Sequence, residues 1–324
     1  MNLTQLSPVA GPPFFLVGSV RSGTTVLRLM LGHHPQICRC DELEYVAGEI
    51  AGRNDWPDVA EYVRRLPRHH GYRQSGFVPD VSMTFPAMVQ DFFAQLRKAD
   101  SRELAGATVH NHFDELTRIW QDAKFIHLVR DPRDVARSCV EIGWAGNAWA
   151  GIGTWLAADD AWQRLVQRLP PEQRLEVRFE DLTSRTESEL ARICEFIGVS
   201  YDPAMIEIEA DSTYRRPNPR DARSWRDGAP PTEVREMEAR LGGRLVRAGY
   251  SPSGLSPLKL SIGRRFALDL DHRFRRMRFS QRRYGILKWV AHAVLRRLDR
   301  FRLLDLPRKR LQTAFDTINR HHMK

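Results

Sequence analysis

The sequence of 324 residues predicts a three-layer α/β/α fold with a parallel sheet, followed by a basic helical tail. Residues 14–20 (FFLVGSV) form an apolar run that is typical of a buried strand, and residues 124–129 (KFIHLV) and 174–179 (RLEVRF) are interpreted as two further strand-forming runs. Each run is followed by apolar residues at helical spacing, and this alternation predicts strands that pair in parallel. Basic residues gather at the C-terminal end, which predicts a separate helical tail.

The charge distribution and the turn signals predict a division into 1–254 and 255–324. Residues 251–257 (SPSGLSP) have the composition of a linker. Residues 255–324 hold 19 of the 50 Lys+Arg and 5 of the 40 Asp+Glu, so the tail carries +14 and the remainder −4 of the net +10. Residues 44–105 interrupt the strand–helix alternation, so we expect a helical insertion there.

The sequence of the tail does not decide whether it binds a membrane surface or a protein surface. Residues 264–302 mix arginine with apolar residues at helical spacing, which suits an anionic membrane surface or packing against the domain or a second subunit in a homodimer. No recognised motif supports nucleic-acid binding. No apolar run reaches ~18 residues and the N-terminus lacks signal-peptide features, so we expect a cytoplasmic protein, with peripheral attachment to the inner membrane face as the alternative.

The four cysteines are not spaced like the ligands of a metal site or like a disulfide framework. Cys38 and Cys40 form a CxC pair, and Cys139 and Cys194 stand far from it. We expect buried free thiols and no metal.

The first strand is followed directly by a glycine-rich turn, Gly18 to Thr25, that opens a helix. Its backbone N–H groups and the helix dipole favour a bound phosphate or sulfate. The spacing of Gly18 and Gly23 is P-loop-like, but Thr24 stands where a nucleotide P-loop has lysine, and Arg21 is the only cation. This loop can hold a terminal anion and a 5′-phosphate without metal; the alternative is an ordinary tight turn.

The segment from Arg21 to Cys38 resembles sulfotransferases, and it is especially similar to tyrosylprotein sulfotransferases and their bacterial relatives. The resemblance implies 3′-phosphoadenosine 5′-phosphosulfate as donor, its 5′-phosphosulfate held by the loop residues Arg21, Ser22, Gly23, Thr24 and Thr25. It also implies that Glu42, by its spacing from Arg21, is the catalytic base. The alternative is a solvated acid, with Asp41 and Glu44 as nearby substitutes.

A second match, residues 125–138, looks like the family's 3′-phosphate segment. The resemblance implies that Arg130 and Ser138, eight residues apart at a strand-to-helix corner, bind this phosphate. Asp131 before Pro132 suits a helix N-cap. The alternative for Arg130 is an ion pair with Asp131 or Asp134.

Further matches extend the resemblance over residues 14–251. Residues 178–182 are similar to the family's YEDL segment, which implies that Phe179 lies near the nucleotide. Trp225 and Arg226 match the C-terminal segment and are expected at the adenine or the 3′-phosphate, while packing of Trp225 in the core is an equal alternative. The family's lysine before the strand arginine is missing: Ala105 stands at that distance, and His110 or His112 is the candidate replacement donor. The alternative is two surface or capping histidines.

The predicted activity is in-line transfer of the sulfuryl group to an acceptor hydroxyl of a tyrosine, sugar or lipid. Trp144 is the candidate for the acceptor site, whereas Trp155 and Trp162 have the spacing of helix core residues. A P-loop kinase is the rival enzyme, and the missing lysine argues against it. A membrane-associated scaffold without activity is the other rival, and the presence of both Glu42 and Arg130 argues against it.

Overall fold

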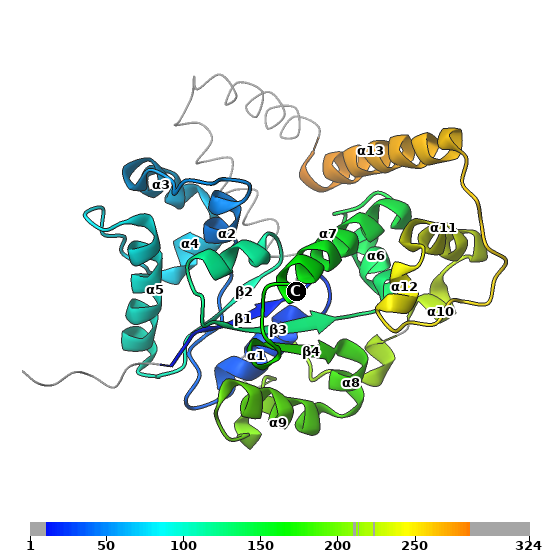
Figure 1. Cartoon of the computed structure of the whole chain (residues 1–324). Helices are drawn as coiled ribbons and strands as arrows, with labels where there is room; N and C mark the ends of the chain where they lie inside the picture. The colour runs from blue at the N-terminus through cyan, green and yellow to red at the C-terminus, as the bar shows by residue number, and fades with distance from the viewer. Residues whose placement is uncertain (1–10, 210–211, 213, 223, 286–324) are drawn as a thin grey trace, which may run out of the picture. The chain divides into compact units, whose positions relative to one another are not determined.

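The computed structural model describes residues 11–209, 212, 214–222 and 224–285 (Figure 1). The chain forms two compact units. The sheet unit combines Met1–Arg130 with Ala157–Ala222, and the helical unit combines Asp131–Leu156 with Arg223–Lys324. The second half of the predicted membrane-binding stretch, from residue 286 onward, lies outside the described residues.

The sheet has four parallel strands in the order β2-β1-β3-β4. They are β1 (Phe14–Val17), β2 (Gly106–Val109), β3 (Lys124–Val129) and β4 (Arg174–Arg178). Phe14 pairs with Gly106 on one side and Lys124 on the other. The parallel α/β prediction is confirmed. Strand β2 was not predicted, because its sequence GATV is short and holds two residues without strand preference.

Both faces of the sheet are covered, which confirms the three layers. Alternate side chains of β1 enter two cores: Phe15 and Val17 point to one, and Phe14 and Leu16 to the other. The second core holds α1 (Thr24–His33) and α9 (Thr186–Ile197), whose apolar residues recur at helical spacing. Gly198, at φ 93°, ends α9 as a left-handed C-cap.

The first core rests on the expected helical insertion. Its elements are α2 (Glu44–Ile50), α3 (Val59–Arg65), the 3₁₀ turn η1 (Leu66–Arg68), α4 (His70–Ser75) and α5 (Phe85–Asp100). The remaining elements of the sheet unit are short: η2 (Phe113–Arg118), η3 (Pro171–Gln173), α8 (Phe179–Ser184), η4 (Pro203–Ile206) and η5 (Pro219–Asp221). All four cysteines are free and buried, as expected. Burial raises the pKa of the Cys38 and Cys194 thiols to about 11.

The helical unit contains α6 (Pro132–Glu141), α10 (Trp225–Gly228), α11 (Pro231–Leu241), α12 (Arg244–Arg247) and α13 (Ile262–Tyr284). Helix α7 (Ala148–Val166) begins in this unit and ends in the sheet unit. Trp155 and Trp162 on α7 are buried, as predicted, and Trp144 is half exposed. None of the described helices is long and apolar enough to cross a membrane.

Candidate active site

The loop from Gly18 to Gly23 joins β1 to α1 in a backbone shape that demands glycine at both ends. A Cβ on Gly18, at φ 147°, would lie 2.4 Å from the carbonyl oxygen of Leu128. A Cβ on Gly23, at φ 97°, would lie 2.4 Å from ring atoms of Phe179. The loop is therefore pressed against β3 and against the start of α8.

The start of α1 is prepared for an anion. Gly23 is its N-cap, no side chain caps it, and its first turn holds no acidic residue. The first amides of a helix have no partner within the helix, so Thr24 and Thr25 offer N–H groups there. The hydroxyl of Ser22, a residue only 1% exposed, is buried without a hydrogen-bond partner among the described residues. An orphan hydroxyl beside free amides fits a phosphate oxygen.

Arg130 leaves the end of β3 and reaches the same loop. Its guanidinium carbon lies 4.5 Å from the ring centre of Phe179. Its Nη1 donates to the carbonyl oxygen of Arg21 at 3.2 Å. The loop and the strand-end arginine, predicted from separate motifs, thus adjoin at the carboxyl edge of the sheet, where ligands of parallel α/β sheets bind.

Of the two candidate histidines, His110 is the one beside the loop. It follows β2 directly, is 9% exposed, and its Nδ1 donates to the Gly18 carbonyl oxygen at 3.0 Å. Its backbone N–H donates to the Glu44 carboxylate, which also accepts from Asn111. His112 is exposed and is the N-cap residue that precedes η2, at φ 55°.

The acidic segment is fixed along the free edge of β2. The Thr108 amide donates to Asp41 O at 3.0 Å and the Leu43 amide donates to Thr108 O at 3.0 Å, so Glu42 bridges Thr108 in parallel. Thr108 in turn pairs with Leu16 of β1. Two strand spacings separate Glu42 from β1, about 10 Å between backbones.

The three acids of this segment differ in their partners. Asp41 forms ion pairs with Arg28 and Arg39, and Glu44 is held by His110 and Asn111. Glu42 is exposed, and within the described part of the chain no hydrogen bond or ion pair engages its carboxylate. Among them Glu42 is the acid available to a substrate.

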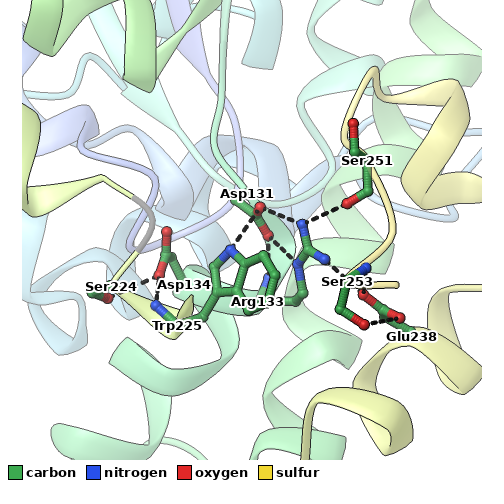
Figure 2. Close-up of polar contacts among 8 residues, drawn as sticks. All are labelled: Asp131, Arg133, Asp134, Ser224, Trp225, Glu238, Ser251 and Ser253. Atoms are coloured by element: carbon green, nitrogen blue, oxygen red, sulfur yellow. Dashed lines mark hydrogen bonds and ion pairs between the residues drawn. The ribbon is translucent and has the colours of Figure 1, made fainter. Parts of the chain in front are cut away.

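The remaining predicted residues belong to the helical unit. Ser138 is half-buried on α6, and Arg226 is exposed on α10. Trp225 is 4% exposed; its Nε1 donates to Asp131 Oδ2 at 3.0 Å and its amide to Asp134 Oδ1 at 2.8 Å (Figure 2). This environment favours the packing alternative for Trp225. The roles of Ser138 and Arg226 stay predictions.

The sequence did not indicate the buried network around Arg133, which is 1% exposed (Figure 2). Arg133 donates to both Asp131 oxygens and to Glu238, and its guanidinium lies 3.6 Å from the Trp225 ring centre. Asp131 also accepts from the Arg133 amide as the predicted N-cap of α6. Only the N-cap had a signal in the sequence, because Glu238 and Trp225 lie about a hundred residues away.

Comparison with known proteins identifies the family of the chain. The model of the sulfotransferase family matches residues 12–203. Protein-tyrosine sulfotransferase A of Caenorhabditis elegans is 25% identical over 276 residues, which cover 76% of this chain and 69% of that protein. Protein-tyrosine sulfotransferase 2 of Gallus gallus is 23% identical over 274 residues, covering 76% and 71%.

Among solved structures, the sulfotransferase domain from the curacin biosynthetic pathway has the same fold. It has a TM-score of 0.53 at 17% identity and covers 74% of this chain and 99% of that one. The chain belongs to the sulfotransferase family. It is an enzyme that transfers the sulfuryl group of 3′-phosphoadenosine 5′-phosphosulfate to a hydroxyl-bearing acceptor.

Proposed function

We propose that the carboxyl edge of β1, β2 and β3 binds the donor and that Glu42 is the general base of the transfer. The observation that carries this proposal is the contact of Arg130 Nη1 with the Arg21 carbonyl oxygen at 3.2 Å. It supports one bisphosphate spanning both segments, its 5′ end on Ser22 to Thr25 and its 3′ end on Arg130. Phe179, stacked on Arg130, flanks the nucleotide.

In the proposed reaction Glu42 accepts the proton of the acceptor hydroxyl. The acceptor oxygen attacks sulfur in line, a new S–O bond forms, and the S–O bond to the 5′-phosphate breaks. The electron pair of the broken bond stays on the phosphate oxygen, where Arg21 and the amides of Thr24 and Thr25 stabilise the added charge. The products are the sulfate ester, the adenosine bisphosphate and protonated Glu42.

His110 is the proposed replacement for the lysine that relatives carry. With Nδ1 donating to Gly18, Nε2 carries a hydrogen only when the ring is charged. A donor role through Nε2 therefore requires the charged imidazolium. The kcat of His110→Gln tests the role: turnover equal to that of the wild type would exclude it.

A tyrosine phenol is the proposed acceptor. The relatives named protein-tyrosine sulfotransferase align over 76% of the chain. A phenol, with a pKa near ~10, also loses its proton more readily to a carboxylate than an aliphatic alcohol does. Incubation with radiolabelled donor and a tyrosine peptide, its phenylalanine counterpart, a sugar and a hydroxylated lipid separates the acceptor classes. Label on the sugar or lipid but not the peptide would refute tyrosine.

The test of the base compares Glu42→Gln with Asp41→Asn, which removes a neighbouring acid engaged by Arg28 and Arg39. Glu42→Gln should lower kcat about 10²–10⁴-fold, with the dissociation constant of 3′-phosphoadenosine 5′-phosphate unchanged. Loss of turnover in Asp41→Asn alone would instead make Asp41 the base.

A further inference from the structure

Helix α13 carries a line of exposed apolar side chains. Ile262, Phe266, Leu270 and Phe274 are 87%, 69%, 57% and 51% exposed. They stand four residues apart, so on a helix they follow one another along the same side. The line spans twelve residues, about 18 Å of helix. Scattered exposed apolar residues are ordinary, but an apolar line of this length marks an interaction surface.

The opposite side of α13 is fixed to the helical unit. Trp149 Nε1 donates to Asp269 at 3.0 Å, and Asn147 Nδ2 donates to Leu268 O at 2.8 Å and to Asp271 at 2.9 Å. The Gly146 amide donates to His272 Nδ1 at 2.9 Å.

Two glycines bring the backbone against α13. A Cβ on Gly146 would lie 2.2 Å from His272 O, and one on Gly143 would lie 2.1 Å from the ring of Phe279. This close packing opposes rotation of α13 about its own axis. The apolar line therefore keeps its outward direction.

The net positive charge of α13 indicates a partner with negative charge. The helix holds eight arginines and two aspartates. Both aspartates accept the hydrogen bonds from Trp149 and Asn147 just described, so each acidic side chain of the helix is engaged by the segment against which α13 packs. By the helical period Arg265, Arg273 and Arg276 flank one side of the apolar line and Arg275 flanks the other, while Arg278 continues the line and lies over the Phe274 ring. The outward surface is thus apolar along its middle and cationic at its margins.

More cations surround the beginning of the helix. A cavity of about 320 Å³ opens between α11, residues 258–261 and the first turn of α13. Arg235, Lys259 and Arg264 line it together with Glu236.

The exposed apolar residues of α13 lie along a convex helix and not in a groove. Such a surface suits a flat partner.

We propose that α13 is an interfacial helix that binds the protein to an anionic lipid bilayer. The apolar line enters the boundary between headgroups and acyl chains, and the flanking arginines pair with lipid phosphates. This inference is independent of the transfer chemistry, because none of these residues takes part in the proposed reaction.

Flotation of the full-length protein with vesicles tests the proposal. The wild type should bind vesicles of phosphatidylglycerol and phosphatidylcholine in equal parts and should stay unbound with phosphatidylcholine alone. Phe266→Glu with Leu270→Glu should lower the partition coefficient at least about 100-fold, because two apolar side chains are lost and two anions are added. The matched control is Val78→Glu with Val81→Glu, two residues that are 73% and 61% exposed in the sheet unit. This control should bind like the wild type.

A second variant, Arg273→Glu with Arg276→Glu, should lose binding and remove its salt dependence. Three results would overturn the proposal: no flotation of the wild type, unchanged flotation of the Phe266/Leu270 variant, or equal flotation with neutral vesicles. Size-exclusion chromatography adds a fourth, since a dimer that dissociates in the Phe266/Leu270 variant would make the line a protein interface. Unchanged thermal unfolding of both variants shows that they fold.

Discussion

Ser22→Ala should change stability and donor affinity in opposite directions. The Ser22 hydroxyl is buried and has no hydrogen-bond partner among the described residues. In the free protein such a group loses its hydration without compensation. In the proposed complex the same hydroxyl donates to a phosphate oxygen. The substitution therefore removes the desolvation cost of the ligand-free protein, and it also removes a hydrogen bond from the complex.

The magnitudes follow from this burial. An unsatisfied buried hydroxyl costs about 1–3 kcal/mol. The free energy of unfolding of the ligand-free variant should therefore exceed that of the wild type by up to about 1 kcal/mol. That gain corresponds to ~2–4 °C in the unfolding midpoint. A hydrogen bond to a charged group is worth about 1.5–3 kcal/mol, so the dissociation constant of the bisphosphate should rise about 10- to 150-fold.

Two measurements on the same preparations decide the outcome. Thermal unfolding without ligand gives the stability change, and calorimetric titration with 3′-phosphoadenosine 5′-phosphate gives the affinity. Thr25→Ser, which keeps a hydroxyl at the neighbouring position, is the control and should change the affinity little. A variant that is less stable than the wild type, or that binds the bisphosphate equally well, would refute the assignment of Ser22 to the 5′-phosphate.

Two further variants probe the rest of the chain. Trp225→Phe removes the hydrogen bond to Asp131 while Asp131 keeps Arg133, so urea unfolding should show a loss of about 1–2 kcal/mol, with bisphosphate affinity unchanged; a tenfold weaker affinity at unchanged stability would instead assign Trp225 to the nucleotide. The hydrogen bond from His127 lowers the pKa of Glu176. A carboxyl group whose pKa is lowered by folding stabilises the fold at any pH above its unfolded-state pKa, and this stabilisation is lost as the pH falls. At pH 7 the free energy of unfolding of the wild type should therefore exceed that of Glu176→Gln by less than ~1 kcal/mol, because Glu176 is half exposed. The difference should disappear as the pH falls and the Glu176 carboxylate becomes protonated; a difference that is constant with pH would contradict this.

The sequence predicted the elements whose signals are local. Strands β1 and β3 are largely apolar runs next to helical patterns, β4 alternates charged and apolar residues, and the loop from Gly18 to Gly23 has fixed glycine spacing. The insertion at 44–105 was recognisable because it broke the alternation. The buried network of Arg133 was not predictable in this way. It joins Asp131 to Trp225 and Glu238, and no short-range pattern reports such distant partners.

The division of the chain also depends on distant contacts. The linker composition at 251–257 predicted a boundary there, and that boundary stays a prediction. The compact helical unit takes in residues 131–156 together with the described residues from 224 to 285. Helix α13 packs against residues 143–149 through hydrogen bonds and two close-lying glycines. Composition alone cannot show that a basic tail helix returns to a segment more than a hundred residues earlier.

The strand missed in the sequence, β2, is the one that organises the proposed chemistry. Two backbone hydrogen bonds of Thr108 set the position of Glu42 along the edge of β2. The Thr108 Oγ1 also donates to Cys40 O at 3.0 Å. Two residues later His110 reaches the Gly18 carbonyl oxygen. Glu42, the proposed base, pairs with the edge of this strand, and His110, the proposed donor, follows its last residue, although sixty-eight residues separate the two in sequence. Their relative position is set by strand register rather than by loop conformation, because a shift of one residue would turn His110 away from the loop.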